Sequence, residues 1–280
     1  MTNGNKPADG GHLILDLDEA IRVRASDVRA AAFIRRFVGG DESIKGSQRF
    51  CLWIQDKDKD LAAQIPAIAE RLERVKTMRA KSPKKLTQDG VKTPHAFQQI
   101  RQDGNEVLLV ISRVSSESRN YLPVTLYEQG TIIVETVFAL FDVPLWNFSI
   151  LASRIHLVWV AAVCGKLETR YRYSSTLGWN TFPVPTLTEK NKADLTRCAE
   201  DIILAREAHF PATIADLYDP DNMPEDLRHA HERNDEVLEC IYIGRRFKND
   251  TERLEKLFDL YTKMTASAGT STKRKVGAPA

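Results

Sequence analysis

The spacing of the apolar residues changes near Pro185, and this change constrains the fold more than any other feature of the chain. Upstream of it, runs such as residues 49–54 (RFCLWI) and 106–112 (EVLLVIS) are short and rich in β-branched, aliphatic or aromatic side chains, as strands are. From Thr188 onward, apolar residues recur every three or four positions, as on one face of a helix. The sequence therefore predicts an α+β fold, in which a mixed α/β region precedes a small all-α domain.

The same patterns give the elements expected in each region. In the first region we expect residues 1–12 to be a linker, strands at 12–16, 49–54, 106–112 and 131–141, and helices at 17–37, 65–78 and 146–167. In the second region, capping residues predict helices at 188–209, at 224–243 and from 249 to about 265.

Composition places the chain among globular proteins and gives no sign of a membrane span. Of its 280 residues, 42% are hydrophobic and 28% charged, and the net charge of +2 is too small to demand a polyanionic partner. The four cysteines are far apart and include no CxxC pair, so the sequence predicts reduced thiols, no metal site and a cytoplasmic location. The longest apolar run, 148–164, is short for a membrane helix and contains Arg154 and His156.

The stretch 167–185 (LETRYRYSSTLGWNTFPVP) carries charged residues at alternate positions. Glu168, Arg170 and Arg172 would share one face of an extended strand. In the major groove of DNA, Arg can donate to guanine O6 and N7, and Glu can accept from the cytosine amino group. A surface strand with a solvated charged face explains the same alternation, so from spacing alone both interpretations stay open.

Two further groups of residues have the chemistry of phosphate contacts. Between residues 71 and 85 seven cations accompany a single acidic residue, and five of them are our candidates: Arg71, Arg74, Lys81, Lys84 and Lys85. A polar segment between the two expected strands adds Ser115, Ser116 and Arg119. A solvated helix face accounts equally well for the first group, and ordinary turn residues account equally well for the second.

Six sequence blocks, taken together and in order, resemble the C-terminal half of MmeI-like restriction–modification enzymes. Those enzymes fuse a nuclease, an adenine methyltransferase and a DNA target-recognition region in one polypeptide. The blocks run from about Lys6 to Tyr261, which is nearly the whole chain. They are PADGGHLIL, IKGSQRFCLWI, RVSSESRNYLP, FSILASRIHLVWVAAVCGKL, RYRYSSTLGWNTFPVP and LYDPDNMPEDLRHAHERND.

The resemblance implies a domain division and a set of base-reading side chains. Residues 1–48 would be a linker and lead-in from a methyltransferase region, 49–186 would form the target-recognition domain and 187–265 the C-terminal helical domain. The small and basic residues of 266–280 predict a disordered tail. Matching positions carry the family's base-reading roles onto Glu168, Arg170 and Arg172, onto Glu135 and Thr136 on the strand upstream of the 146–167 helix, and onto Arg113. Glu168 and Arg170 together would suit one C·G pair.

The catalytic motifs of that family are absent from the sequence. It contains no NPPY motif, no glycine-rich cofactor loop and no PD…ExK-like nuclease cluster. We therefore expect a specificity fragment or subunit with no catalytic residues and no metal or cofactor of its own, because S-adenosylmethionine and Mg²⁺ belong to other regions of the parent enzymes. The expected partners are double-stranded DNA and a methyltransferase/nuclease polypeptide, with no membrane.

Two alternatives stay open. The chain could take part in methylation once it joins a catalytic half, or it could be an interaction module that docks a methyltransferase half without binding DNA.

Overall fold

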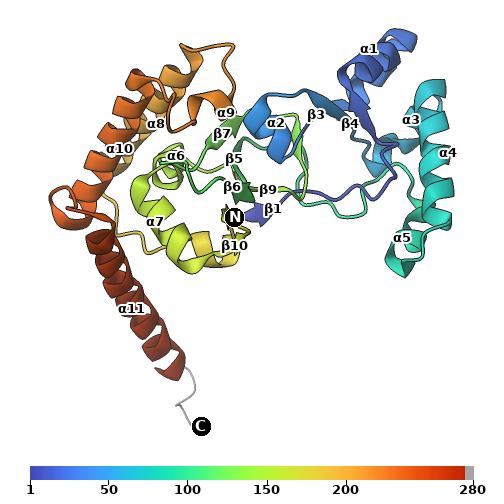
Figure 1. The fold of residues 1–280 in the computed structure, drawn as a ribbon. Helices are drawn as coiled ribbons and strands as arrows, with labels where there is room; N and C mark the ends of the chain where they lie inside the picture. Colours follow the sequence, from blue (N-terminus) through green and yellow to red (C-terminus); the bar gives the residue numbers. More distant parts are fainter. Residues whose placement is uncertain (275–280) are drawn as a thin grey trace. The chain divides into compact units, whose positions relative to one another are not determined.

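The computed structural model describes the backbone of residues 1–274 and the side chains of residues 1–266. The chain folds into two compact units whose segments alternate along the sequence. Unit 1 contains Arg113–Val124 and the chain from Val143 onward, and unit 2 contains Thr2–Ser112 and Thr125–Asp142. The mixture of helices and small sheets, with a helical C-terminal region, confirms the predicted α+β class (Figure 1).

Unit 2 is built on two four-stranded sheets. The first has the order β2-β4-β3-β8, in which only β3 and β8 are parallel. Its strands are β2 (Ile14–Asp16), β4 (Arg49–Leu52), β3 (Ile34–Val38) and β8 (Thr131–Ile133). The second has the order β1-β9-β5-β7. Its strands are β1 (Thr2–Asn3), β9 (Val137–Phe141), β5 (Leu108–Ser112) and β7 (Val124–Tyr127).

Several helices of unit 2 bury apolar side chains in the core beside the first sheet. The helices of this unit are α1 (Leu17–Ser26), η1 (Val28–Phe33), α2 (Gly40–Lys45), η2 (Asp56–Asp58), α3 (Lys59–Ala63), α4 (Pro66–Ala80), α5 (Lys85–Asp89) and η3 (Gly90–Lys92). Of these, α1, η1, α3 and α4 contribute to that core. Ile68, Leu72 and Val75 of α4 are buried at three- and four-residue steps, and they join a core that contains Phe37 and Leu52 of the sheet. The sequence predicted this apolar stripe.

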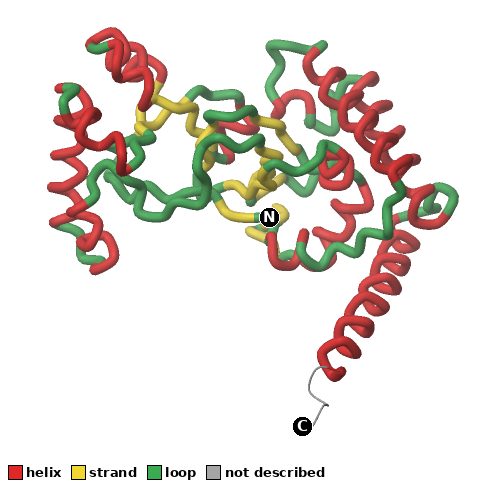
Figure 2. The backbone as a smooth tube through the Cα atoms, turned by 180° about the vertical axis from the view of Figure 1, so that it is seen from behind, coloured by secondary structure: helices red, strands yellow, loops and turns green. Residues whose placement is uncertain are grey.

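Unit 1 combines a small sheet with the C-terminal helices. Its elements are β6 (Val114–Ser115), α6 (Trp146–Leu151), α7 (Arg154–Val163), β10 (Gly165–Leu167), β11 (Arg170–Arg172), η4 (Ser175–Trp179), α8 (Glu189–Glu207), α9 (Ile214–Leu217), α10 (Glu225–Ile243) and α11 (Asp250–Arg274). The core joins Trp159 of α7 to Leu195 of α8 and Leu238 of α10. Figure 2 shows α11 as an unbroken helix, and its side chains from Thr262 to Ala266 are all exposed.

The three C-terminal helices begin where the sequence predicted. Thr188 accepts a hydrogen bond from Asn191 N and caps α8, and Asn249 Oδ1 accepts from Glu252 N at the start of α11. The last helix is longer than predicted, because α11 continues to Arg274 rather than ending near residue 265. The rest of the predicted tail, 275–280, lies outside the described residues.

The predicted linker at residues 1–12 is wrong. Asn5 is fully buried, donates to Gln102 Oε1 and Ile133 O, and accepts from Arg101 N. Asp9 is also buried and accepts from Leu13 N. These polar side chains fix the segment inside unit 2, and the whole of 1–48 belongs to that unit apart from Met1.

Three predicted elements are divided in the structure. The helix expected at 17–37 ends at Ser26, because Asp27 accepts from Arg29 N and starts η1, after which β3 pairs with β4 and β8. The helix expected at 146–167 breaks at Ala152, where Ser153 caps α7, and its last residues form β10. The strand expected at 131–141 is two strands separated by a turn.

Candidate nucleic-acid interface

The candidate base-reading residues nearest the C-terminus lie on a β-hairpin. Strand β10 pairs antiparallel with β11, and β11 pairs on its other side with β6. Glu168 and Thr169 form the two-residue turn of the hairpin, and Glu168 has a left-handed backbone with φ +57°. The sequence placed Glu168 on the strand with the two arginines, and this was wrong, because the chain reverses direction at that residue.

The register of the hairpin determines which side chains share a face. Arg170 lies opposite Leu167, and Arg172 lies opposite Gly165. Arg170 and Arg172 are two residues apart on one strand, so they point to the same face of the hairpin. Both side chains are exposed. The other face carries Tyr171 and its partner on β6, Ser115.

Glu168 and Arg170 form an ion pair across the end of the hairpin. Arg170 Nη2 donates to Glu168 Oε2 at 2.6 Å, and the two side chains are 46% and 75% exposed. An exposed pair contributes little to stability, typically about 0–1 kcal/mol. Its effect is to fix a guanidinium donor beside a carboxylate acceptor on an open surface.

Sequence reasoning missed three polar residues beside this pair. The hydroxyl of Thr169 donates to the carboxylate of Glu117, which lowers the pKa of Glu117, and the charges of Lys166 and Arg170 lower that pKa further. Glu117 comes from the segment after β6, so a long-range strand pairing brings it here. The alternation of charged residues over 166–172 could have predicted that Lys166 belongs to this group. No local pattern indicated Glu117.

The buried side of the hairpin is anchored in the core of unit 1. Tyr173 N donates to Arg113 O at 2.8 Å, which places the backbone of Arg113 beside the end of β11. The hydroxyl of Tyr173 lies 3.0 Å from His156 Nε2, and both residues are buried. Burial lowers the pKa of His156 to about 3, so the imidazole is neutral. His156 is therefore a packing residue.

Glu135 and Thr136 lie in unit 2, in the turn between β8 and β9 rather than on a strand. Thr136 is exposed, and its hydroxyl oxygen accepts from Gly40 N at 3.1 Å, in the first turn of α2. Glu135 is half-buried, and its backbone N donates to Asn5 O. Arg113, Glu168, Arg170 and Arg172 lie in unit 1, so the six candidates are divided between the units.

The prediction that residues of 71–85 contact phosphates is wrong for Arg71. Two of the other candidates, Arg74 and Lys85, already have acidic partners within the protein. Arg71 turns inward: it donates to His12 O and Ile14 O and pairs with Glu19 at 2.6 Å. Arg74 pairs with Glu70, and Lys85 pairs with Asp89 at 2.9 Å. Among the described residues, Lys81 and Lys84 are exposed and make no ion pair.

The candidates of the 113–121 segment also divide. Ser115 is buried, so it is not a surface phosphate ligand. Arg119 is half-buried; burial lowers its pKa, while the charge of Asp219 raises it, so this guanidinium faces the C-terminal region. Ser116 is half-buried, and its Oγ lies 2.8 Å from the hydroxyl of Ser118.

Two features are not found in the described part of the chain. Within residues 1–274, no group of three or more His, Cys, Asp or Glu side chains is arranged to hold a metal ion. No helix there has both the length and the apolar character needed to cross a membrane.

Comparison with known proteins defines the class of this fold. The family model for the MmeI target recognition domain matches residues 1–186, and the model for the MmeI C-terminal domain matches residues 187–268. The chain belongs to the MmeI family, and these two domains account for nearly all of it. The sequence resemblance is thereby confirmed.

Two relatives illustrate how much of the family's architecture is present. The chain is 37% identical over 262 residues to DNA methyltransferase A of Bacillus subtilis (strain 168), covering 94% of this chain and 30% of that protein. It superposes with a TM-score of 0.88 and 32% identity on a solved structure of the Type IIL restriction–modification enzyme MmeI in complex with DNA, covering 94% of this chain and 35% of that one. The chain thus spans about a third of the length of these relatives.

Proposed function

We propose that this chain reads base sequence in double-stranded DNA, as the target-recognition part of an MmeI-like restriction–modification methyltransferase. The single observation that carries the proposal is the exposed Glu168–Arg170 pair at the end of the β10–β11 hairpin. It offers one acceptor and one set of forked donors side by side, and a C·G pair requires this combination in the major groove. The match to MmeI solved with DNA supports it.

The proposed reading surface extends beyond this pair. Arg172 lies on the same face of β11, and Arg113 lies beside the end of that strand. Glu135 and Thr136 are proposed as readers in unit 2. Contacts to phosphates do not carry sequence information but fix the protein on the duplex. For these contacts we propose Lys81 and Lys84, which make no ion pair within residues 1–274, together with Ser116.

The chain is proposed to act with a methyltransferase/nuclease polypeptide in the cytoplasm. S-adenosylmethionine and Mg²⁺ are assigned to that polypeptide, so the purified chain is expected to bind no S-adenosylmethionine in calorimetric titration. Methylation by this chain alone would contradict the assignment.

Selection from a randomised DNA duplex pool at moderate salt tests the proposal. Enrichment of one short asymmetric word is expected. The double variant Glu168→Lys, Arg170→Asp should then change the preferred base at one position and leave the other positions unaltered. Losing one bidentate contact costs about 1–3 kcal/mol of discrimination.

Two outcomes would contradict the proposal in different ways. Equal affinity for all four base pairs at every position would contradict base reading. Failure to bind any duplex at low salt would instead favour the interaction module, which docks a methyltransferase half without DNA.

A further inference from the structure

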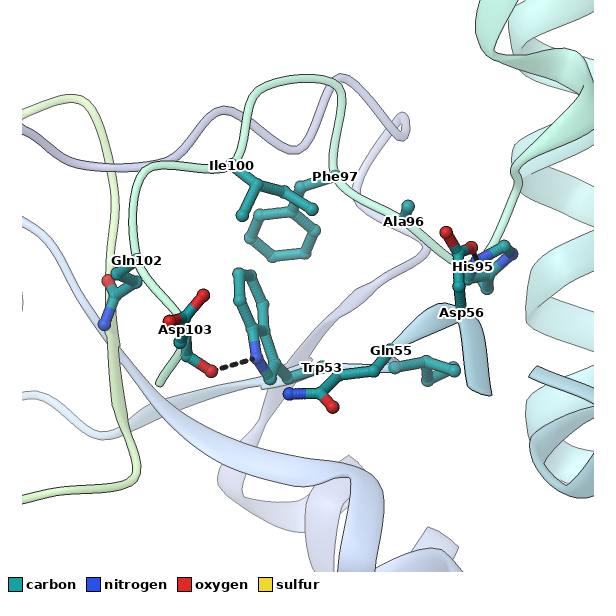
Figure 3. Close-up of a pocket in the computed structure, with 10 residues that line it drawn as sticks. Trp53, Gln55, Asp56, His95, Ala96, Phe97, Ile100, Gln102 and Asp103 are labelled. Carbon is teal, nitrogen blue, oxygen red and sulfur yellow. Dashed lines mark hydrogen bonds and ion pairs between the residues drawn. The ribbon is translucent and has the colours of Figure 1, made fainter. Parts of the chain in front are cut away.

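Unit 2 contains a pocket that the DNA-reading proposal does not use. It has a volume of about 340 Å³ and lies between the chain after β4 and the loop that follows η3. Its lining includes Trp53, Asp56, His95, Phe97, Ile100 and Asp103 (Figure 3). Volume and lining are those of a site for a small group: mostly apolar walls with a few polar atoms.

The apolar part of the pocket is held rigidly. The indole Nε1–H of Trp53 donates to Asp103 O at 3.2 Å. Phe97 is buried and meets the indole at 88°, with ring centroids 5.2 Å apart. Figure 3 shows the indole almost edge-on, with Asp103 on one side and Gln55 and Asp56 on the other. The ring is therefore fixed with a face toward the polar end of the pocket.

The polar end presents an exposed carboxylate. Asp56 Oδ1 lies 2.7 Å from His95 Nε2, and the carboxylate is 83% exposed at the mouth. The buried imidazole behind it fixes the orientation of the carboxylate. A second carboxylate, Asp103, belongs to the lining on the opposite side of the indole, and the lining contains neither lysine nor arginine (Figure 3). An aromatic face next to carboxylates attracts a cation.

We propose that this pocket binds the side chain of an arginine presented by a polypeptide. A guanidinium is flat, stacks on an indole and forks onto a carboxylate, whereas an ammonium does neither as well. The arginine's methylene stem would run along Ile100, which is 53% exposed at the rim, so that the partner's backbone can stay outside. The DNA-reading proposal assigns no role to the residues that line this site.

Titration of the full chain with N-acetyl-L-arginine amide tests the proposal, with the Trp53 indole N–H followed by NMR and assigned with Trp53→Phe. The neutral isostere N-acetyl-L-citrulline amide should bind about tenfold more weakly, since it keeps the shape but loses the charge. Methylguanidinium should also bind more weakly, because it lacks the stem.

Two variants supply the matched comparison. Asp56→Asn should weaken arginine amide binding by about tenfold, while Asp60→Asn, an exposed carboxylate of α3 outside the pocket lining, should leave it unchanged. The proposal is overturned if arginine and citrulline amides bind alike, or if the Trp53 signal does not move. If methylguanidinium bound as tightly as the arginine amide, the pocket would recognise only the guanidinium group, and the proposed recognition of a whole arginine side chain would be wrong.

Discussion

At the scale of single residues, the same side-chain type has two different fates on α4. Arg79 is 1% exposed and donates to five backbone carbonyls, those of Pro7, Ala8, Gly90, Thr93 and Ala96. Arg74, five residues earlier, is an exposed side chain paired with Glu70. The local sequence does not distinguish them, because the carbonyls that bind Arg79 lie 11 to 72 residues away along the chain.

Replacing Arg79 tests this assignment. Arg79→Met should lower the free energy of unfolding by about 3 kcal/mol, because several buried carbonyls lose their donor. Urea denaturation followed by circular dichroism measures the change. On the same helix, Arg74→Met should cost no more than about 1 kcal/mol; equal losses in the two variants would show that Arg79 is not a structural hub.

The exposed lysines allow a second residue-scale prediction, which rests on the proposed DNA binding. Lys81→Gln and Lys84→Gln should each weaken binding to all DNA sequences alike and reduce the slope of log affinity against log salt by about one. Arg71→Gln should leave that slope unaltered and lower stability instead, because its guanidinium is already bound to Glu19 and two carbonyls. Filter binding at several salt concentrations measures the slopes.

At the scale of elements, locally encoded features were predictable and long-range pairings were not. The starts of α8, α10 and α11 were predicted within two residues, because caps such as Thr188 act on their own turn. The turn at Glu168 was missed, since Glu-Thr is not a typical hairpin sequence and the strand is stabilised by β6, about 55 residues earlier. The alternating arginines of β11 were recognisable because period two survives in even a short strand.

The hairpin turn gives a prediction that separates conformation from chemistry. Glu168→Asn should leave stability unchanged or slightly higher, because Asn adopts a left-handed backbone more readily than Glu does, yet it removes the carboxylate that pairs with Arg170. Discrimination at one base pair should fall by about 1–3 kcal/mol. Glu168→Gln is the matched control, since it removes the charge without favouring the turn. Competition binding with single-base substitutions reports the result.

At the scale of the whole molecule, the last part of the target-recognition match packs in one core with the C-terminal domain, as Trp159 and Leu238 show. Tyr121, upstream of residue 186, donates to Asp235 Oδ2 on α10 at 3.0 Å, and Arg154 N donates to Asp235 Oδ1 at 2.7 Å. Residues 143–186 consequently belong to the same compact unit as the C-terminal helices. These compact units do not coincide with the boundary between the family models.

Asp235 makes the stability of the molecule depend on pH in an unusual direction. Burial raises its pKa to about 7, although the bonds from Arg154 N and Tyr121 oppose the shift. Between about pH 4 and pH 7 the folded state therefore holds a proton that the unfolded state has lost, and this group's contribution to stability falls as pH rises. His156, whose pKa is lowered to about 3 by burial, acts in the opposite direction below pH 6.5.

Removing this carboxyl should change the pH profile. Between pH 5 and pH 7 the unaltered protein should lose about 2 kcal/mol of unfolding free energy through the deprotonation of Asp235. Asp235→Asn has no such group, so its unfolding free energy should change over this range by about 2 kcal/mol more in the stabilising direction. Urea denaturation at the two pH values measures the difference. Parallel profiles for the two proteins would contradict the raised pKa.

The alternation of the two units along the chain has a consequence for how new specificities can arise in this family. The chain passes between the units after Ser112, after Val124 and after Asp142. A genetic crossover between codons 113 and 142 would therefore give each unit segments from both parents. Both cores would then contain side chains that did not evolve together. Recombination is expected to transfer such a module whole. Under the proposed function, stepwise change of specificity would come from point substitutions at exposed positions such as Arg170 and Arg172 of the β10–β11 hairpin, whose side chains lie outside the core.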